Sequence, residues 1–407
     1  MKAKLIVGGA AAATSAVALL LGGVLTGGGT PQARALPTGA VVAQVDRRGN
    51  AFAQRARMTA DVAYYTRAQY AYRRALRLSP HDLPATIGLG ALELSRHEFR
   101  HALALGRRAV ALSPTTAAGY GVIGDAQVEL GRYPSAFATF DRMVALKPGV
   151  SSYARVSYAR ELRGDVPGAA RAMQYAVDAA AGEPNALAWS HMQLGKLYWA
   201  HGKAAAAARE YREALRIEPG FTYALDALAQ VEAARGRFAS AVALSRRAAE
   251  VMPFPQFVAN YGDVLRAAGR PGAARRQYAL VGVIGRLERA NHVNVDLELA
   301  LFDVDHGVRL ARTVALARAA QAERPSIDGD DVLAWALARN GRCGEALHFS
   351  ERALRLGTLD APKFFHRGMI ERCLGRRVDA KRWFRGALAL NPHFSLLWTP
   401  VARRYAR

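Results

Sequence analysis

Cysteine and lysine are scarce in this chain of 407 residues. Cys343 and Cys373 are the only cysteines, which excludes both a cysteine-based metal cluster and a scaffold held by several disulfides. Seven of the 56 basic residues are lysines, so arginine carries nearly all of the positive charge. No long segment rich in proline and serine divides the chain. A single extended architecture is therefore favoured over domains joined by linkers.

Signatures of catalysis are missing as well. The sequence contains no G-x-S-x-G elbow, no Walker loop and no Cys/His cluster with metal-ligand spacing. Each of these patterns places a nucleophile, a phosphate or a metal ion in a defined local geometry. We therefore expect no catalytic residues, no bound metal and no cofactor, and the protein is not expected to be an enzyme.

The net charge is strongly positive. The 56 Lys and Arg residues against 33 Asp and Glu give +23. An excess of arginine and alanine also follows from a GC-rich genome, so the charge alone is weak evidence for an anionic partner, and nucleic acid is not favoured.

The N-terminal segment 1–35 has the pattern of an export signal. Lys2 and Lys4 precede an apolar run from Leu5 to Leu25, and Ala33-Arg34-Ala35 offers a small-x-small cleavage site. The run is also long enough to span a bilayer. Two alternatives follow: a signal peptide cleaved after Ala35, or an uncleaved membrane anchor. Both predict an extracytoplasmic protein.

Beyond residue 48 the sequence repeats itself with a period near 34. In the stretch 188–221, Leu194-Gly195 is followed by Tyr198, then by Ala207 with Tyr211 four residues later, and a proline closes the stretch. Pro80, Pro114 and Pro148 are spaced by 34 and 34 residues, and glycines recur at similar intervals from Gly131 to Gly375. Such a period is the signature of a stacked repeat architecture.

These columns resemble the tetratricopeptide repeat, whose unit carries L-G-x-x-Y, A-x-x-x-F and a closing proline. The resemblance implies an all-α solenoid, a right-handed superhelix of about ten helix-turn-helix units. Units are expected to begin near residues 49, 83, 117, 150, 188, 222, 255, 293, 327 and 361. The predicted organisation is a linker over 36–48, the superhelix over 49–394 and a C-terminal capping helix over 395–407.

Two motifs that would otherwise suggest an enzyme are explained by their positions in the repeat. His97-Glu98-Phe99-Arg100-His101 matches the H-E-x-x-H pattern of zinc peptidases, but His97 occupies the turn position that glycine fills in other units, and zinc binding requires both histidines on one helix face. The G-x-G-x-x-G from Gly119 to Gly124 follows no strand, as a dinucleotide site would require. A zinc peptidase therefore remains only a minor alternative.

The two cysteines leave two alternatives. Cys343 is expected to open the second helix of one unit, and Cys373 to end the first helix of the next. Adjacent antiparallel helices would bring these ends to the same side, so the pair forms either a disulfide or two buried free thiols.

The resemblance implies a scaffold that binds partner peptides in its concave groove. Inner positions of the fifth and sixth units mix aromatic, charged and amide side chains, the composition of a binding hot spot. Alternatively, the tryptophans fill irregular space beside extra residues near Glu183. The predicted peptide-binding residues are Trp189, Met192, Lys196, Trp199, Tyr223, Asp226 and Gln230.

A second candidate site is a basic ridge on the second helices, expected on the convex side of the superhelix. It predicts binding to anionic envelope polymers or to a membrane surface, and the alternative role for the ridge is solubility. Its members are Arg73, Arg74, Arg107, Arg108, Arg212, Arg246, Arg247, Arg352 and Arg385.

Reversing the charge of six ridge arginines tests this alternative. If the ridge holds the protein near anionic polymers, the variant should be released from the cell envelope, because the attraction depends on the sign of the charge. Fractionation of cells expressing each form measures the effect. Unchanged retention would assign the ridge to solubility.

Overall fold

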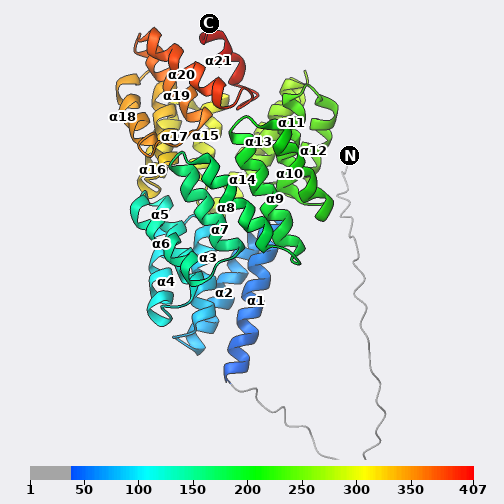
Figure 1. Ribbon diagram of the computed structural model, residues 1–407, viewed down its shortest axis with the longest axis vertical. Coiled ribbons are helices and arrows are strands. Elements are labelled where there is room, and N and C mark those ends of the chain that lie inside the picture. The colour runs from blue at the N-terminus through cyan, green and yellow to red at the C-terminus, as the bar shows by residue number, and fades with distance from the viewer. Residues whose placement is uncertain (1–37) are drawn as a thin grey trace, which may run out of the picture. The chain divides into compact units, whose positions relative to one another are not determined.

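The computed structural model describes residues 38–407, and its regular structure consists of 21 helices (Figure 1). The predicted signal peptide or anchor over 1–35 lies outside the described residues. Among the described helices, none is long and apolar enough to cross a membrane. The helices are α1 (Thr38–Thr59), α2 (Ala63–Leu78), α3 (Leu83–Ser95), α4 (Phe99–Leu112), α5 (Ala117–Glu129), α6 (Tyr133–Leu146), α7 (Val150–Leu162), α8 (Val166–Ala179), α9 (Pro184–Ala200), α10 (Ala204–Ile217), α11 (Thr222–Ala234), α12 (Phe238–Val251), α13 (Pro255–Ala267), α14 (Pro271–Ala290), α15 (Asp296–His306), α16 (Leu310–Glu323), α17 (Ile327–Arg339), α18 (Cys343–Ala353), α19 (Ala361–Cys373), α20 (Arg377–Leu390) and α21 (Thr399–Tyr405).

Consecutive helices form ten pairs, from α1 with α2 to α19 with α20, and each pair packs on the next. The predicted all-α solenoid is confirmed. Short turns between paired helices contain residues with positive φ, such as Gly131 at 69°. Glycine suits these turns because it has no Cβ to clash with the backbone in that conformation.

The first boundary prediction was wrong. Helix α1 begins at Thr38, inside the segment predicted as a linker over 36–48. Its N-terminal turns carry Val41, Val42 and Val45, which pack against the hydrophobic cluster formed with α2 and α3. The segment is helical because this apolar face is covered, so the first pair begins well before residue 49.

Three further elements differ from the expected lengths. The extra residues near Leu287 extend α14 to 20 residues, and those near Glu183 precede a 17-residue α9, so they lengthen helices as well as connections. The C-terminal cap is shorter than predicted: α21 covers Thr399–Tyr405, preceded by turns from residue 392 to 398. The cap still packs on the last pair, since Tyr405 lies 5.6 Å from Phe384 between ring centroids.

Within each pair, small residues of the first helix pack against aromatic rings of the second helix. A Cβ added at Gly124 would lie 2.2 Å from the Phe140 ring, and one at Gly262 would lie 2.3 Å from the Tyr278 ring. These rings therefore occupy the space that a side chain on the first helix would need. The same arrangement joins Gly195 to Tyr211 and Gly368 to Phe384.

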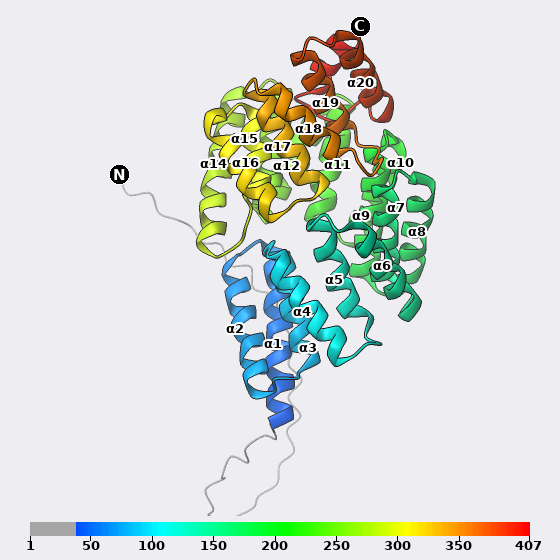
Figure 2. The same ribbon diagram turned by 90° about the vertical axis from the view of Figure 1, so that its left-hand side faces the viewer.

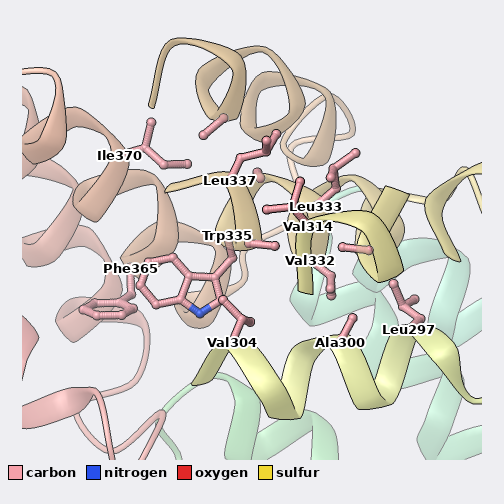
Figure 3. Packing of buried hydrophobic residues seen from close by; sticks show 14 of the residues in the cluster. Leu297, Ala300, Val304, Val314, Val332, Leu333, Trp335, Leu337, Phe365 and Ile370 are labelled. Carbon is pink, nitrogen blue, oxygen red and sulfur yellow. The ribbon is translucent and has the colours of Figure 1, made fainter. Parts of the chain in front are cut away.

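The largest core cluster surrounds Trp335 on α17 (Figure 3). The indole is 1% exposed and meets Phe365 of α19 at 5.9 Å between ring centroids. Leu297, Val304 and Val314 of α15 and α16 close the same cluster. This core joins the last three repeats to the C-terminal cap, because Trp398 lies 5.5 Å from Trp335.

Successive turns of the superhelix touch along a seam (Figure 2). The Asn294 N–H donates to the Arg96 carbonyl at 3.0 Å, and the Ile327 N–H donates to the Tyr133 hydroxyl at 2.7 Å. The Asn391 amide donates to the Trp199 carbonyl at 2.8 Å across 192 residues. The seam therefore joins turns inside the second to fifth pairs to loops about six repeats further along the chain.

Cys343 and Cys373 form a disulfide, with 6.1 Å between their Cα atoms. Cys343 opens α18 and Cys373 ends α19, as the repeat frame predicted. Of the two sequence-based alternatives, the structure therefore has the disulfide and not the pair of buried free thiols.

The basic ridge is exposed over most of its length. Arg73, Arg74, Arg107, Arg108, Arg246 and Arg247 are all exposed on second helices. Three members form ion pairs. Arg352 lies 3.1 Å from the buried carboxylate of Asp330, Arg212 lies 3.0 Å from buried Glu232, and Arg246 lies 3.8 Å from exposed Glu250. The side chain of Arg352 is still 41% exposed, so it remains partly in solvent.

The seam can be tested with a matched pair of glycine variants. Gly131 and Gly236 both have positive φ, at 69° and 74°, so alanine costs backbone strain at either position. Only at Gly131 would the new Cβ meet the next superhelical turn, 2.3 Å from the Pro325 carbonyl oxygen. We expect Gly131→Ala to lower the free energy of unfolding by about 1–2 kcal/mol more than Gly236→Ala. Urea unfolding measures the difference, and equal losses would show that the seam contributes nothing to stability.

Candidate functional site

The inside of the superhelix contains three cavities whose walls come mainly from first helices. We call them the aromatic cavity, of about 610 Å³, the acidic cavity, of about 450 Å³, and the seam cavity, of about 260 Å³. The aromatic and acidic cavities share a wall formed by Asp328, Asp360, Pro362, Lys363 and Phe394. They exist because the second superhelical turn folds back over the first.

The aromatic cavity contains three of the predicted peptide-binding residues. Trp189, Lys196 and Trp199 of α9 all line it. Lys196 is exposed, whereas both indoles are half-buried and also touch neighbouring hydrophobic clusters. The two tryptophans thus combine a packing role with a surface that faces the cavity.

The other wall of this cavity carries a bidentate ion pair. Arg155 of α7 donates from Nε to Asp125 at 2.8 Å and from Nη2 at 2.6 Å. Tyr158, 39% exposed, lines the same cavity and also the seam cavity. Rings and paired charges side by side offer both stacking and hydrogen-bonding surfaces to a ligand.

The remaining predicted site residues do not join this group. Gln230 lines the acidic cavity instead. Met192 is 6% exposed and belongs to the core around Tyr211, and Asp226 is 5% exposed. Tyr223 packs edge-on against Phe257 at 5.2 Å and lines none of the three cavities. The predicted residues are thus divided: Trp189, Lys196 and Trp199 share one cavity and Gln230 lines another, whereas the other three line none of the three.

Lys363 is the centre of the shared wall. Its ammonium lies 2.7 Å from Asp328 and 2.7 Å from Asp360, although the side chain is only 8% exposed. Burial alone would lower the pKa of Lys363, but the surrounding carboxylates raise it well above its usual value. The charge of Lys363 in turn lowers the pKa of Asp328. The wall is therefore a charged cluster in which one ammonium faces two carboxylates.

Asp305 at the end of α15 connects the acidic cavity to the C-terminal cap. Its Oδ1 accepts hydrogen bonds from the indole N–H groups of Trp335 and Trp398, each at 2.9 Å. Among residues 38–407, no Lys, Arg or His forms an ion pair with Asp305, and no group donates to its Oδ2. Burial raises the pKa of Asp305 above its usual value.

Two histidine–aspartate pairs line the same cavity. His306 has acceptors at both ring nitrogens: the Phe302 carbonyl at 2.8 Å from Nδ1 and the Asp263 carboxylate at 2.8 Å from Nε2. Burial would lower the pKa of His306, but the hydrogen bond and charge of Asp263 raise it. Likewise, burial would lower the pKa of His366, but the nearby charge of Asp331 raises it. Both rings are therefore held as cations more readily than free histidine.

Even so, the acidic cavity has an excess of negative charge. Six carboxylates line it against two permanent cations, Arg324 and Lys363. The whole chain has the opposite sign, +23. The carboxylates are those of Asp263, Glu298, Asp305, Asp328, Asp331 and Asp360.

Sequence analysis missed most of these lining residues, although one signal was available. Asp125, Tyr158 and Asp263 occupy the same column as Lys196 and Gln230, immediately after the small packing residue of the first helix. Comparing this position in all repeats would have predicted that these three side chains lie inside the superhelix. Nothing in the repeat pattern brings Lys363 close to the aromatic cavity, because that proximity comes from the return of the chain after one superhelical turn.

Neither motif set aside in the sequence forms a site. His97 has a positive φ of 61° in the turn before α4, as its repeat position predicted, and its ring meets the Asn294 carbonyl at 2.6 Å. His97 therefore precedes the helix that carries His101. Residues 38–407 contain no group of three or more potential ligands arranged to hold a metal ion. Gly124 is a packing glycine within α5.

Comparison with known proteins gives one matching family model, described as tetratricopeptide repeat, over residues 190–221. Curated proteins give no match. Similar solved structures include a thermophilic tetratricopeptide-repeat protein of Thermus thermophilus, at 22% identity and TM-score 0.41, covering 50% of this chain and 99% of that one. Another is YrrB, described as a tetratricopeptide-repeat protein with an unusual peptide-binding site, at 18% identity and TM-score 0.32, covering 49% and 98%. A third, from Parabacteroides merdae, has 12% identity and TM-score 0.42, covering 62% and 98%.

Asp226 gives this interior a testable pH dependence. Burial raises its pKa from 3.8 to about 7, and its Oδ1 has no hydrogen-bond partner. The folded state therefore disfavours the ionised form, so the cost is absent below the unfolded pKa, grows as pH rises and is complete above about 7. We expect Asp226→Asn to raise the free energy of unfolding at about pH 8, by up to about 4 kcal/mol, and to leave it unchanged near pH 3.

Denaturant unfolding of both forms at several pH values measures the effect. Asp141→Asn, which removes an exposed carboxylate on α6, is the matched control and should change stability little at any pH. A loss of stability in Asp226→Asn at about pH 8 would contradict the prediction.

Proposed function

We propose that this chain, a tetratricopeptide-repeat protein, is a non-enzymatic scaffold that binds a peptide segment of a partner protein inside its superhelix. The aromatic cavity carries this proposal. It places Tyr158, Trp189 and Trp199 around about 610 Å³ of space beside the exposed ammonium of Lys196. Large rings with a few placed polar groups are the usual composition of a site that binds peptide side chains.

The repeat architecture supports a binding role over catalysis. The inner side chains come from successive first helices, and their rigid stacking holds them in place without a ligand. The polar groups of the aromatic cavity are largely satisfied by one another, as in the Arg155–Asp125 pair. A preformed surface of this kind binds with little loss of conformational entropy.

We place this function outside the cytoplasm. The support comes from the export-type sequence over 1–35 and from the disulfide between Cys343 and Cys373, a bond that persists in oxidising compartments. The N-terminal segment serves either as a signal cleaved after Ala35 or as an anchor.

A second role is favoured by the exposed arginines. The pairs Arg73-Arg74, Arg107-Arg108 and Arg246-Arg247 keep their guanidinium groups in solvent on second helices, whereas the aromatic cavity is lined largely by first helices. We propose that they hold the scaffold near anionic envelope polymers or a membrane surface. Peptide binding and surface retention would then use separate parts of the molecule.

The peptide-binding proposal can be tested with the full chain and a random peptide library. Peptides selected by the wild-type protein should bind Trp199→Ala about 30-fold more weakly, the loss expected for a hot-spot ring. Tyr70→Ala removes a ring that is 64% exposed on α2 and should leave affinity unchanged. Fluorescence anisotropy of labelled peptides measures the affinities.

Trp199 also touches the core, so its substitution can lower stability as well as affinity. Measuring the melting temperature of each variant separates the two effects. Lys196→Glu alters an exposed side chain of the same cavity and should change the peptide affinity without changing the melting temperature. Peptides that bind both variants as tightly as the wild type would refute the proposal.

A further inference from the structure

We infer that the acidic cavity receives a lysine or arginine side chain of the bound peptide, so that the partner segment is basic. This inference rests on the proposed peptide-binding function and adds the chemistry of the ligand. Its basis is the excess of carboxylates in a cavity of about 450 Å³ next to the aromatic cavity, among them Asp305, which has no ion-pair partner within residues 38–407.

The cations of the acidic cavity do not balance its six carboxylates, which face Lys363, Arg324 and two histidines. Lys363 pairs with Asp328 and Asp360, Arg324 pairs with Glu298 at 2.8 Å, and the two histidines pair with Asp263 and Asp331. Asp305 receives only two neutral indole N–H groups, both on Oδ1. Asp305 is half-buried, and the charges of His306, His366 and Arg339 act on it only from beyond ion-pair distance. An incoming ammonium or guanidinium group would give it a direct ion pair.

A second unpaired carboxylate lies next to the same cavity. Asp226 is 5% exposed, its Oδ2 accepts from Gln230 and Asn260, and its Oδ1 has no partner. Gln230 and Asn260 both line the acidic cavity. Burial raises the pKa of Asp226 to about 7, so its ionised form is disfavoured until a cation approaches this wall.

The walls also suit a cation. Trp398, Phe394 and Phe365 line the cavity beside the carboxylates, and aromatic faces attract ammonium and guanidinium groups. Such contacts already exist beside this cavity: the Arg339 guanidinium lies 5.3 Å from the Trp335 ring and 5.0 Å from the Trp398 ring. Arg339 does not line the cavity, so the space beside Asp305 is left to a ligand.

The shared wall connects the two halves of this site. Because Phe394 and Pro362 border both cavities, a peptide that rests on Trp189 and Trp199 passes next to the acidic cavity. A long basic side chain can then enter it while the peptide backbone stays in the wider aromatic cavity.

The test uses the full chain and two labelled probes, a peptide of alternating arginine and alanine and a matched peptide of alternating glutamate and alanine. The wild type should bind the arginine peptide at least about tenfold more tightly than the glutamate peptide. Asp305→Asn keeps an oxygen to accept the two indole N–H groups but loses the charge, and should weaken the arginine peptide about tenfold. Asp141→Asn, with the same change of charge on an exposed surface, should have no effect.

Further outcomes separate this inference from the proposed function. If Trp199→Ala weakens both peptides and Asp305→Asn weakens neither, the peptide site stands and the basic ligand is wrong. If free spermine binds with the same Asp305 dependence but does not compete with the arginine peptide, the cavity takes a free amine and the inference is overturned. Circular dichroism melting of Asp305→Asn near that of the wild type ensures that any loss comes from the charge.

Discussion

The contact between successive turns of the superhelix is the constraint on which the interior depends. A stack of helix pairs in which each pair touches only its neighbours would leave an open inner face. Here Asn294 reaches Arg96, Ile327 reaches Tyr133 and Asn391 reaches Trp199, so the chain closes on itself after about six repeats. Closure narrows the groove into partly open cavities. It also explains why α17 and α19 contribute to the same walls as α7 and α9.

Closure requires the turns at the seam to be small. Gly131, Gly164 and Gly202 would each place a Cβ within 3 Å of a carbonyl oxygen of the next superhelical turn. Gly236 and Gly269 have the same backbone conformation but nothing within 4 Å. Glycine thus serves two purposes: from the third pair onward it allows the left-handed turn, and at Gly131, Gly164 and Gly202 it also admits the second superhelical turn.

The charge distribution follows from the same geometry. Arginines on second helices point to solvent, where their repulsion is screened, whereas the inner positions of the C-terminal repeats collect carboxylates around Lys363. Enclosure lowers the local dielectric, so each unpaired charge inside is expensive and each pair is strong. A basic protein thereby holds an acidic cavity, and the contrast between the two surfaces gives them different partners.

The sequence by itself determined the local unit. The 34-residue period, the turn glycines and the pairing of Gly124 with Phe140 or Gly262 with Tyr278 are contacts within one helix pair, so they leave a regular trace in the chain. The neighbouring ends of α18 and α19 that carry Cys343 and Cys373 were predictable for the same reason. What only the tertiary structure decided is the site. Small rotations between successive repeats accumulate until residues about 190 positions apart come into contact. No local sequence pattern predicts this accumulated rotation. Trp199 therefore shares a cavity with Lys363, while Met192 and Tyr223, from the same predicted group, face elsewhere.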